Sequence, residues 1–175
     1  MAGDQRFAPP VAQVEDIAPE AGHQAVRLWP AGGRIGRLRL LAYGLGLYIG
    51  LIVITFMLGL VAGATGLPAD LAVGIGIAIY AVGTVLLLVQ RSHDMNMAGW
   101  WSIAALIPLV GLVWVFKAGT PGRNRWGAPP PPNTLFVKIA GLAIPVLMGL
   151  GIVAAIALPA YSDYVKRAQG GVVGR

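Results

Sequence analysis

The chain contains no cysteine and only two histidines. The lack of thiols excludes disulfide bonds, thiolate-bound metals and cysteine nucleophiles. A metal site needs three or four convergent ligands, and His93 with its neighbour Asp94 does not supply them. We therefore predict that the protein binds no metal ion and no cofactor.

Charge is also scarce in this sequence. Asp, Glu, Lys and Arg make up 11% of the residues, whereas about a quarter of a soluble protein is charged. Hydrophobic residues reach 57%, the mean hydropathy is +0.72, and the apolar residues fall in long uncharged blocks. This pattern predicts an all-α integral membrane protein. No ionisable residue stands in the middle of a predicted span, which argues against an ion channel or a proton-coupled transporter.

Acidic residues are the rarer of the two signs. The chain has 7 Asp and Glu against 13 Lys and Arg, a net charge of +6. No helix-turn-helix, zinc finger or basic-aromatic pattern accompanies this charge, and membrane proteins collect Lys and Arg in cytoplasmic loops. We therefore expect the basic loops to meet anionic lipid headgroups, and we predict no nucleic-acid partner.

The composition divides the chain into four parts. Residues 1–30 are polar and rich in Pro and Ala, with no apolar core typical of a secretory signal peptide, and are predicted to be a disordered cytoplasmic tail. Residues 31–128 form a predicted polytopic membrane domain, residues 129–135 a Pro-rich linker, and residues 136–175 a final helix with a short tail.

Three segments are long enough to cross a bilayer as full helices, at roughly residues 41–63, 70–90 and 136–158. The first is expected to insert the chain, with the N-terminus in the cytoplasm, and Pro145 predicts a kink in the last. The protein is therefore placed in the bacterial inner membrane as a multi-pass protein.

Glycines recur at four-residue spacing in the first of these spans, at Gly46 and Gly50 and again at Gly59 and Gly63. Small residues at this spacing allow a neighbouring helix to approach closely. The pattern therefore predicts close packing of the first span, and it predicts no particular oligomeric state.

A further hydrophobic segment, residues 102–116, is shorter and holds Pro108 and Gly111 near its centre. Roughly 16 residues make about 24 Å of helix, less than the hydrocarbon core of about 30 Å. It either crosses as a short kinked helix or enters and returns as a re-entrant hairpin. Counts of Lys and Arg on each side do not separate the two topologies. The broken segment and the character of the last helix favour the hairpin, which places the C-terminus outside.

His93 beside Asp94 is the one adjacent pair that suggests general-base catalysis. No serine or cysteine nucleophile is paired with it. The alternative is that Asp94 caps a helix or forms ion pairs with Arg34, Arg37 or Arg91. Because Arg34 and Arg37 are three residues apart, we expect them on one helix face at the headgroups. We favour the structural interpretation and predict no enzyme activity and no catalytic residue.

Five motifs follow one another along residues 30–128: G-R-x-x-R from Gly33, R-x-H-D from Arg91, G-W-W from Gly99, P-x-x-G from Pro108 and G-T-x-G-x-N-R-W-G from Gly119. Together they resemble a bacterial inner-membrane family known as domain of unknown function 805. The resemblance implies an integral inner-membrane protein, and the family has no established activity. One departure is Ser92, where the family commonly has Leu. The candidate structural or interface motif consists of Arg34, Arg37, Arg91, His93, Asp94, Trp100, Trp101, Asn124 and Arg125.

The last helix resembles the N-terminal helix of type IV pilins over about residues 149–169, in the string AAIALPAYSDYVKRAQ. Upstream the match fails, because Lys138, Val137 and Leu142 stand where a pilin has its N-terminal Phe, its cleavage-site Gly and its Glu. Processing by prepilin peptidase and assembly into a pilus are therefore not expected. The candidate helix-partner segment consists of Ala155, Pro159, Tyr161 and Tyr164.

These features support two hypotheses about function. The first is a non-enzymatic membrane accessory or interaction protein whose last helix packs with pilin or pilus-assembly helices. The second is a lipid-facing or small-molecule transport-related membrane protein in which the last helix is a plain anchor.

Overall fold

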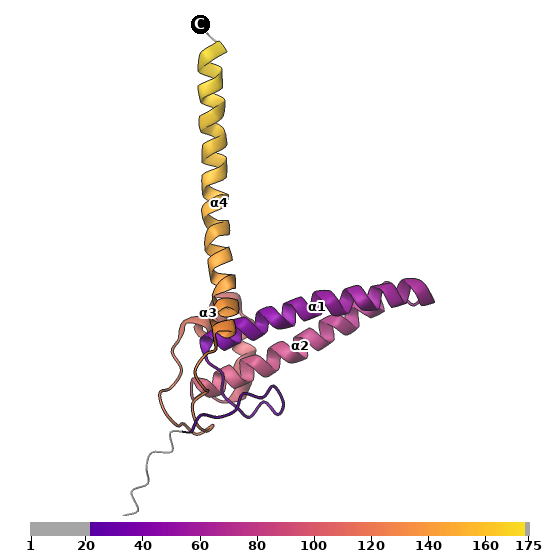
Figure 1. Cartoon of the computed structure of the whole chain (residues 1–175), viewed down its shortest axis with the longest axis vertical. Helices are drawn as coiled ribbons and strands as arrows, with labels where there is room; N and C mark the ends of the chain where they lie inside the picture. The colour runs from indigo at the N-terminus through magenta and orange to yellow at the C-terminus, as the bar shows by residue number, and fades with distance from the viewer. Residues whose placement is uncertain (1–21, 174–175) are drawn as a thin grey trace, which may run out of the picture.

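The computed structural model describes residues 22–173, and within them every regular element is a helix (Figure 1). The elements are α1 (Arg37–Thr65), α2 (Ala69–Asp94), the 3-10 helix η2 (Gly99–Leu106), α3 (Pro108–Phe116) and α4 (Leu135–Val173). Three of the described helices, α1, α2 and α4, are long and apolar enough to cross a membrane. For the described residues, the expectation of an all-α protein with three helices long enough to span a membrane is confirmed.

The helices α1 and α2 lie side by side as a long antiparallel arm (Figure 1). A left-handed turn at Gly66 ends α1. The close approaches in this arm come from α2: a Cβ on Gly76 would lie 2.3 Å from Thr55, and one on Gly83 would lie 2.9 Å from Leu47.

The prediction that the glycine pairs of the first span provide this close packing is wrong. A Cβ added at Gly46, Gly50, Gly59 or Gly63 would meet no atom within 4 Å. Glycine spacing within one helix cannot show which face meets its neighbour, and here the partner helix supplies the small residues.

The short hydrophobic segment forms two separate helices, η2 and α3, joined at Ile107. Pro108 occupies the first turn of α3, where its missing N–H costs no helical hydrogen bond. Gly111 lies against the backbone of η2, since a Cβ there would be 2.5 Å from the Ala105 carbonyl oxygen. The segment therefore doubles back on itself at Pro108, and α3, with nine residues, is too short to cross a bilayer.

The helix α4 packs against α1 alone among the described elements and leaves the α1–α2 arm at a wide angle (Figure 1). It runs as one helix through Pro145 and Pro159. Contact is tightest at Gly141, where a Cβ would lie 2.6 Å from the Leu38 carbonyl oxygen. From Pro145 to Gln169 nearly every residue is exposed.

The end of the predicted disordered tail is structured. Residues 1–21 lie outside the described residues, but residues 22–30 are irregular backbone held against the rest of the protein. The Gln24 N–H donates to the Pro129 carbonyl at 3.0 Å, and Gln90 binds the Arg27 carbonyl at 2.8 Å. Partners distant in the sequence order this segment, and its own composition gives no sign of them.

The hydrophobic core lies where the base of the α1–α2 arm meets α3, not along the arm. Its buried residues are Ile35, Leu40, Leu87, Met95 and Trp114.

Replacement of Gly141 by alanine tests the contact between α4 and α1. The added methyl group would press on a backbone atom that cannot rotate away, and overpacking of this kind costs about 1–3 kcal/mol. We expect a lower thermal unfolding midpoint of the detergent-solubilised protein. Gly149→Ala is the matched control. It gives the same gain in helix propensity, but its added methyl group meets no atom within 4 Å. Equal midpoints for the two variants would contradict the packing.

Candidate functional site

Three buried charged residues, Arg34, Arg91 and Asp94, form an ion triad. The Arg34 and Arg91 side chains are fully buried and the Asp94 side chain is 5% exposed. Arg34 donates to Asp94 Oδ1 from Nε at 3.2 Å and from Nη2 at 3.1 Å. Arg91, one helical turn before Asp94, binds Oδ2. A single carboxylate thus holds two guanidinium groups, and each of its oxygens accepts from a different arginine.

Backbone carbonyls supply the remaining partners of Arg34. Its Nη1 donates to the carbonyls of Gly122 at 2.7 Å and Gly127 at 3.1 Å, and its Nη2 to that of Thr120 at 2.7 Å. All five N–H groups of a guanidinium can be satisfied by this set. Gly122 and Gly127 have φ of 64° and 115°, values that side chains rarely allow, so glycine is needed to turn both carbonyls inward.

Arg91 caps the C-terminal end of α3. Its Nε donates to the Trp114 carbonyl at 2.8 Å and its Nη2 binds the Lys117 carbonyl. The last carbonyls of a helix lack partners within it and carry partial negative charge, which favours a cation there. The triad therefore ties the end of α3 to the end of α2.

The loop 117–127 in turn caps α2. Thr120 donates to the Asp94 carbonyl from both its N–H and its hydroxyl, each at 2.8 Å. Asn124 Nδ2 donates to the His93 carbonyl at 2.9 Å and to the Thr120 hydroxyl at 2.7 Å. The Asn124 side-chain oxygen accepts from the Trp126 N–H at 2.8 Å, which closes the loop on itself.

His93 has a structural position. Its ring stacks on Trp126 with centroids 3.7 Å apart, and its Nδ1 lies 3.2 Å from the Gly33 carbonyl. Arg125 lies over the same tryptophan ring, with its guanidinium carbon 5.3 Å from the ring centroid. His93 and Arg125 thus both contact the Trp126 ring.

Other predicted residues lie outside the triad. Arg37 is exposed and donates to the Phe116 carbonyl at 3.2 Å. Trp100 and Trp101 are exposed and stack on each other at 4.3 Å. The expectation that Arg34 and Arg37 share a helix face is wrong, because α1 begins at Arg37 and Arg34 precedes it in non-helical backbone. The carbonyls that Arg34 binds come from the loop 117–127, so its side chain turns inward.

The candidate helix-partner segment is separate from this site. Ala155, Pro159, Tyr161 and Tyr164 all lie on the exposed part of α4, and the two tyrosines are 67% and 70% exposed. The structure describes no partner for them, so their proposed role stays a prediction.

Sequence reasoning missed three buried polar residues beside the triad. Ser92 accepts a 2.9 Å hydrogen bond from the Trp114 indole and itself donates to the Leu88 carbonyl. Gln90 is fully buried on α2. Arg39 is 4% exposed and donates to the carbonyls of Pro131 and Pro132. The run of four prolines in the linker was the available sign of this contact, since each proline offers a carbonyl acceptor and no N–H donor.

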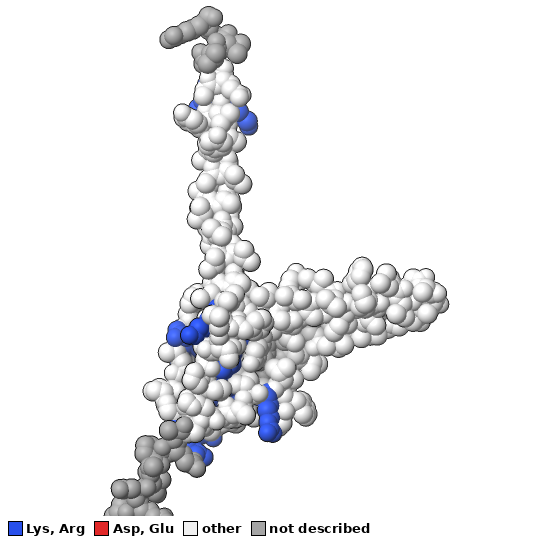
Figure 2. Space-filling view, in the orientation of Figure 1, with Lys and Arg blue, Asp and Glu red and all other residues white. Residues whose placement is uncertain are grey.

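The outer surface of this region is basic. Figure 2 shows this by the blue atoms at the junction, the region where α4 meets the base of the α1–α2 arm. The α1–α2 arm and the middle of α4 carry no charged atoms on this face. Asp94, the one described acid near the junction, is buried, so its charge does not offset the outer cations. The exposed basic residues around the junction are Arg27, Arg37, Lys117, Arg123, Arg125 and Lys138.

The geometry indicates a structural role for the triad and its loop. The donors of Arg34 are used in bonds within the protein, and His93 is held by stacking. Among the described residues no group of three or more His, Asp and Glu side chains could hold a metal ion. The side chains that suggested chemistry therefore hold the ends of α2 and α3 and the start of α1 together.

Comparison with known proteins finds a family model that covers these motifs. The family model described as protein of unknown function DUF805 matches residues 29–128, the region that contains the triad and its loop. Two relatives, both called inner membrane protein YhaH, from Escherichia coli K12 and O157:H7, are each 36% identical over 87 residues. Each alignment covers 45% of this chain and 72% of the relative. No solved structure matches the chain significantly.

Replacement of Asp94 by alanine tests the structural role of the ion triad. It would leave two buried guanidinium groups without a counter-charge, and breaking a buried pair costs about 3–5 kcal/mol. We expect lower abundance in the membrane and a markedly lower thermal midpoint. Gly119→Ala would act in the same direction, because its Cβ would lie 2.0 Å from Asp94 Oδ2.

Asp70→Ala is the control for this experiment. Asp70 is an exposed acid at the other end of α2, where its loss removes at most about 1 kcal/mol of helix-dipole stabilisation. Normal abundance and stability of the Asp94 variant would overturn the structural role.

Proposed function

The chain belongs to the DUF805 family of proteins of unknown function, and we propose that it is a multi-pass inner-membrane protein that acts by interaction and not by catalysis. The three apolar helices and the similarity to a protein called inner membrane protein YhaH support the location. The residues that could carry chemistry are already committed to the ion triad and its loop.

The observation that carries the interaction role is the exposure of α4. This helix has 39 residues and touches the remainder of the described protein only near its start. Residues 139–162 contain no charge and would extend about 36 Å, enough to cross a bilayer. A membrane helix with this much free surface can pack against a helix of another protein.

The sequence of α4 supports a partner with pilin-like helices. The string from Ala154 to Gln169 has the residue pattern of a pilin helix, and pilin helices pack against one another. Ala155 and Pro159 lie in its apolar part, and Tyr161 and Tyr164 follow where the helix becomes polar. The alternative is that α4 is an anchor in lipid.

The charge distribution supports an orientation. The exposed basic residues gather where α4 meets the base of the α1–α2 arm, whereas the turn between α1 and α2 at residues 66–68 has no Lys or Arg. By the positive-inside rule the junction faces the cytoplasm. Because Arg91 binds carbonyls at the end of α3, the η2–α3 segment begins and ends at the junction, as a re-entrant segment would.

In this orientation α4 starts at the cytoplasmic face and ends outside. The wide angle between α4 and the α1–α2 arm means that both can cross one bilayer only after α4 rotates about its contact with α1 (Figure 1). Gly141 lies at that contact, where the small residue allows the two backbones to approach closely.

Photocrosslinking tests the partner. A photoreactive residue in place of Ala155 or Tyr161, in cells that make type IV pili, should yield a crosslink that an anti-pilin antibody detects. The control is Leu71, which is apolar and 53% exposed but lies on α2. A chain truncated after residue 138 should recover no pilin in a membrane pull-down. Absence of pilin from every α4 crosslink would reject this partner and favour the anchor.

Reporter fusion tests the orientation. A reporter active only in the periplasm should be active when fused after Arg175, and one active only in the cytoplasm should be active when fused after Asn133, just before α4. Activity of a cytoplasmic reporter at the C-terminus would reject the re-entrant topology in favour of a straight crossing.

A further inference from the structure

The contact between α4 and α1 lies at the base of both helices and leads onto an open face of α1. Val137 and Gly141 of α4 are buried. A Cβ on Gly141 would lie 2.6 Å from the carbonyl oxygen of Leu38, in the first turn of α1. One turn further along α1, Ala42 is 4% exposed, whereas Gly46, one turn beyond it, is exposed. The interface is therefore established at its base and unoccupied further along.

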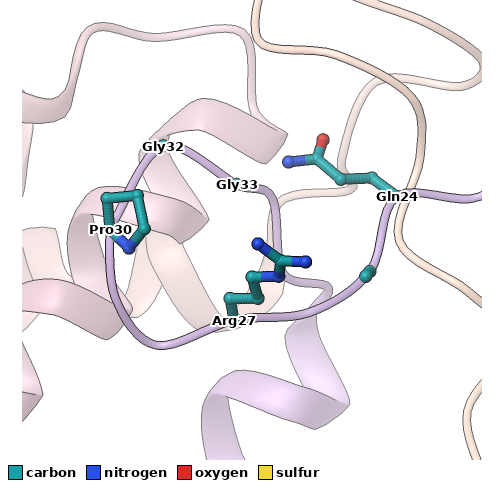
Figure 3. A pocket seen from close by; sticks show the side chains of 6 residues that line it. Gln24, Arg27, Pro30, Gly32 and Gly33 are labelled. Carbon is teal, nitrogen blue, oxygen red and sulfur yellow. The ribbon is translucent and has the colours of Figure 1, made fainter.

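The chain on both sides of this contact is held in place. Arg39 of α1 donates to the carbonyls of residues 131–132, in the linker that leads into α4. Figure 3 shows the loop before α1 curving from Gln24 round to Gly33, and the Gln24 N–H donates to the Pro129 carbonyl of the same linker at 3.0 Å. A shift of α4 along α1 would break these bonds. The remaining freedom of α4 is therefore rotation about the contact.

The uncharged parts of the two helices begin close to this contact. On α1 the last charged residue is Arg39, next to Leu38. On α4 Lys138 precedes Gly141 by one turn, and no other charge follows until Asp163. Two helices that cross one bilayer must place their uncharged runs at the same depth, since charge in the hydrocarbon core is costly. The contact already aligns the two runs in this way.

Small residues continue the contact along both helices. The residues at four-residue steps from it are Ala42, Gly46 and Gly50 on α1 and Pro145 and Gly149 on α4. Because every helical residue rises about 1.5 Å, Gly46 and Gly149 lie equally far from the contact. A Cβ on either would meet no atom within 4 Å, so neither has a neighbour yet. Small residues at this spacing let two helices pack at about −40°, which a tilt of about 20° for each accommodates in one bilayer.

We propose that in the bilayer α4 turns about its contact at Gly141 and packs in parallel along the outer face of α1, with Gly149 opposite Gly46. The face is free for this helix, because α2 meets α1 elsewhere, at Leu47, Leu51 and Thr55. The helix α1 then lies between α2 and α4 in a three-helix bundle.

This bundle leaves the candidate helix-partner segment free. Helices that cross at about −40° separate beyond their closest contact, so Ala155 and the two tyrosines after it stay accessible to another protein. The inference rests on the orientation proposed above, in which α1 and α4 start at the same membrane face. It does not rest on a protein partner for α4.

Thiol crosslinking of the full chain in its membrane tests the docking, and the native sequence has no cysteine that would interfere. Ile49 and Ile152 each follow the contact by about three turns, and both are exposed while α4 points away from α1. A short bismaleimide should join Ile49→Cys to Ile152→Cys within one chain. The control pair is Ile49→Cys with Leu150→Cys. Leu150 lies at nearly the same depth but about 200° around α4 from Ile152, so this pair should give no product within one chain.

Replacement of Gly149 by leucine tests the close approach. The larger side chain would occupy the space opposite Gly46 and should lower the yield of the Ile49–Ile152 crosslink about tenfold. Gly151→Leu is the matched control, because Gly151 is equally open but lies about 200° around the helix from Gly149. It should leave the yield unchanged. Circular dichroism and size-exclusion profiles equal to those of the original protein establish that each variant is folded.

Four outcomes would overturn the proposal. They are no product from the Ile152 pair, equal product from the Ile152 and Leu150 pairs, product only at twice the mass of the chain, and an unchanged yield with Gly149→Leu. Product at twice the mass would assign the face of α1 to a second copy. Absence of the crosslink in a protein whose C-terminal reporter is periplasmic rejects this inference alone, whereas a cytoplasmic C-terminus rejects the orientation beneath it. Pilin crosslinking is a separate measurement, so the two proposals fail separately.

Discussion

Two buried arginines that share one buried carboxylate are the constraint on which this structure depends. Neither guanidinium could leave water without Asp94, and Asp94 alone leaves the triad with a net positive charge. Backbone carbonyls from the loop 117–127 and from the end of α3 accept hydrogen bonds from the arginines and so stabilise this net positive charge. Each carbonyl must be brought to a fixed place, so the triad dictates the course of three segments that are distant in the sequence.

This constraint explains why the hydrophobic segment between α2 and the basic loop is broken. Arg91 holds the end of α3 beside the end of α2, and Thr120 and Asn124 then cap α2. A straight spanning helix would carry its C-terminal end about 24 Å away or more, out of reach of Arg91. Pro108 and Gly111 allow the reversal, and the ion triad makes it favourable.

Hydropathy and length were enough to predict the all-α class and the three long helices, because each span is a local property of the sequence. The partners of single side chains could not be derived in this way. Arg34, Arg37 and Arg39 look alike in the sequence, yet Arg34 joins the triad, Arg37 is exposed and Arg39 binds proline carbonyls. Trp114 and Ser92 meet only because α3 folds back, so no periodicity in either segment reveals their hydrogen bond. Residues 22–30 were misjudged for the same reason.

The base of α4 and the rest of that helix differ in how many contacts hold them in place. Arg39 fixes the linker at the carbonyls of Pro131 and Pro132, and Gly141 sets the contact of α4 with α1, so the base of α4 is held. Beyond Pro145 the helix makes no contact that the fold requires. Substitutions there leave the triad and the core untouched, whereas substitutions around Asp94 disturb several segments at once. The exposed part of α4 can therefore accept substitutions without a cost in folding, and the same freedom is absent from the part of the chain that defines the family.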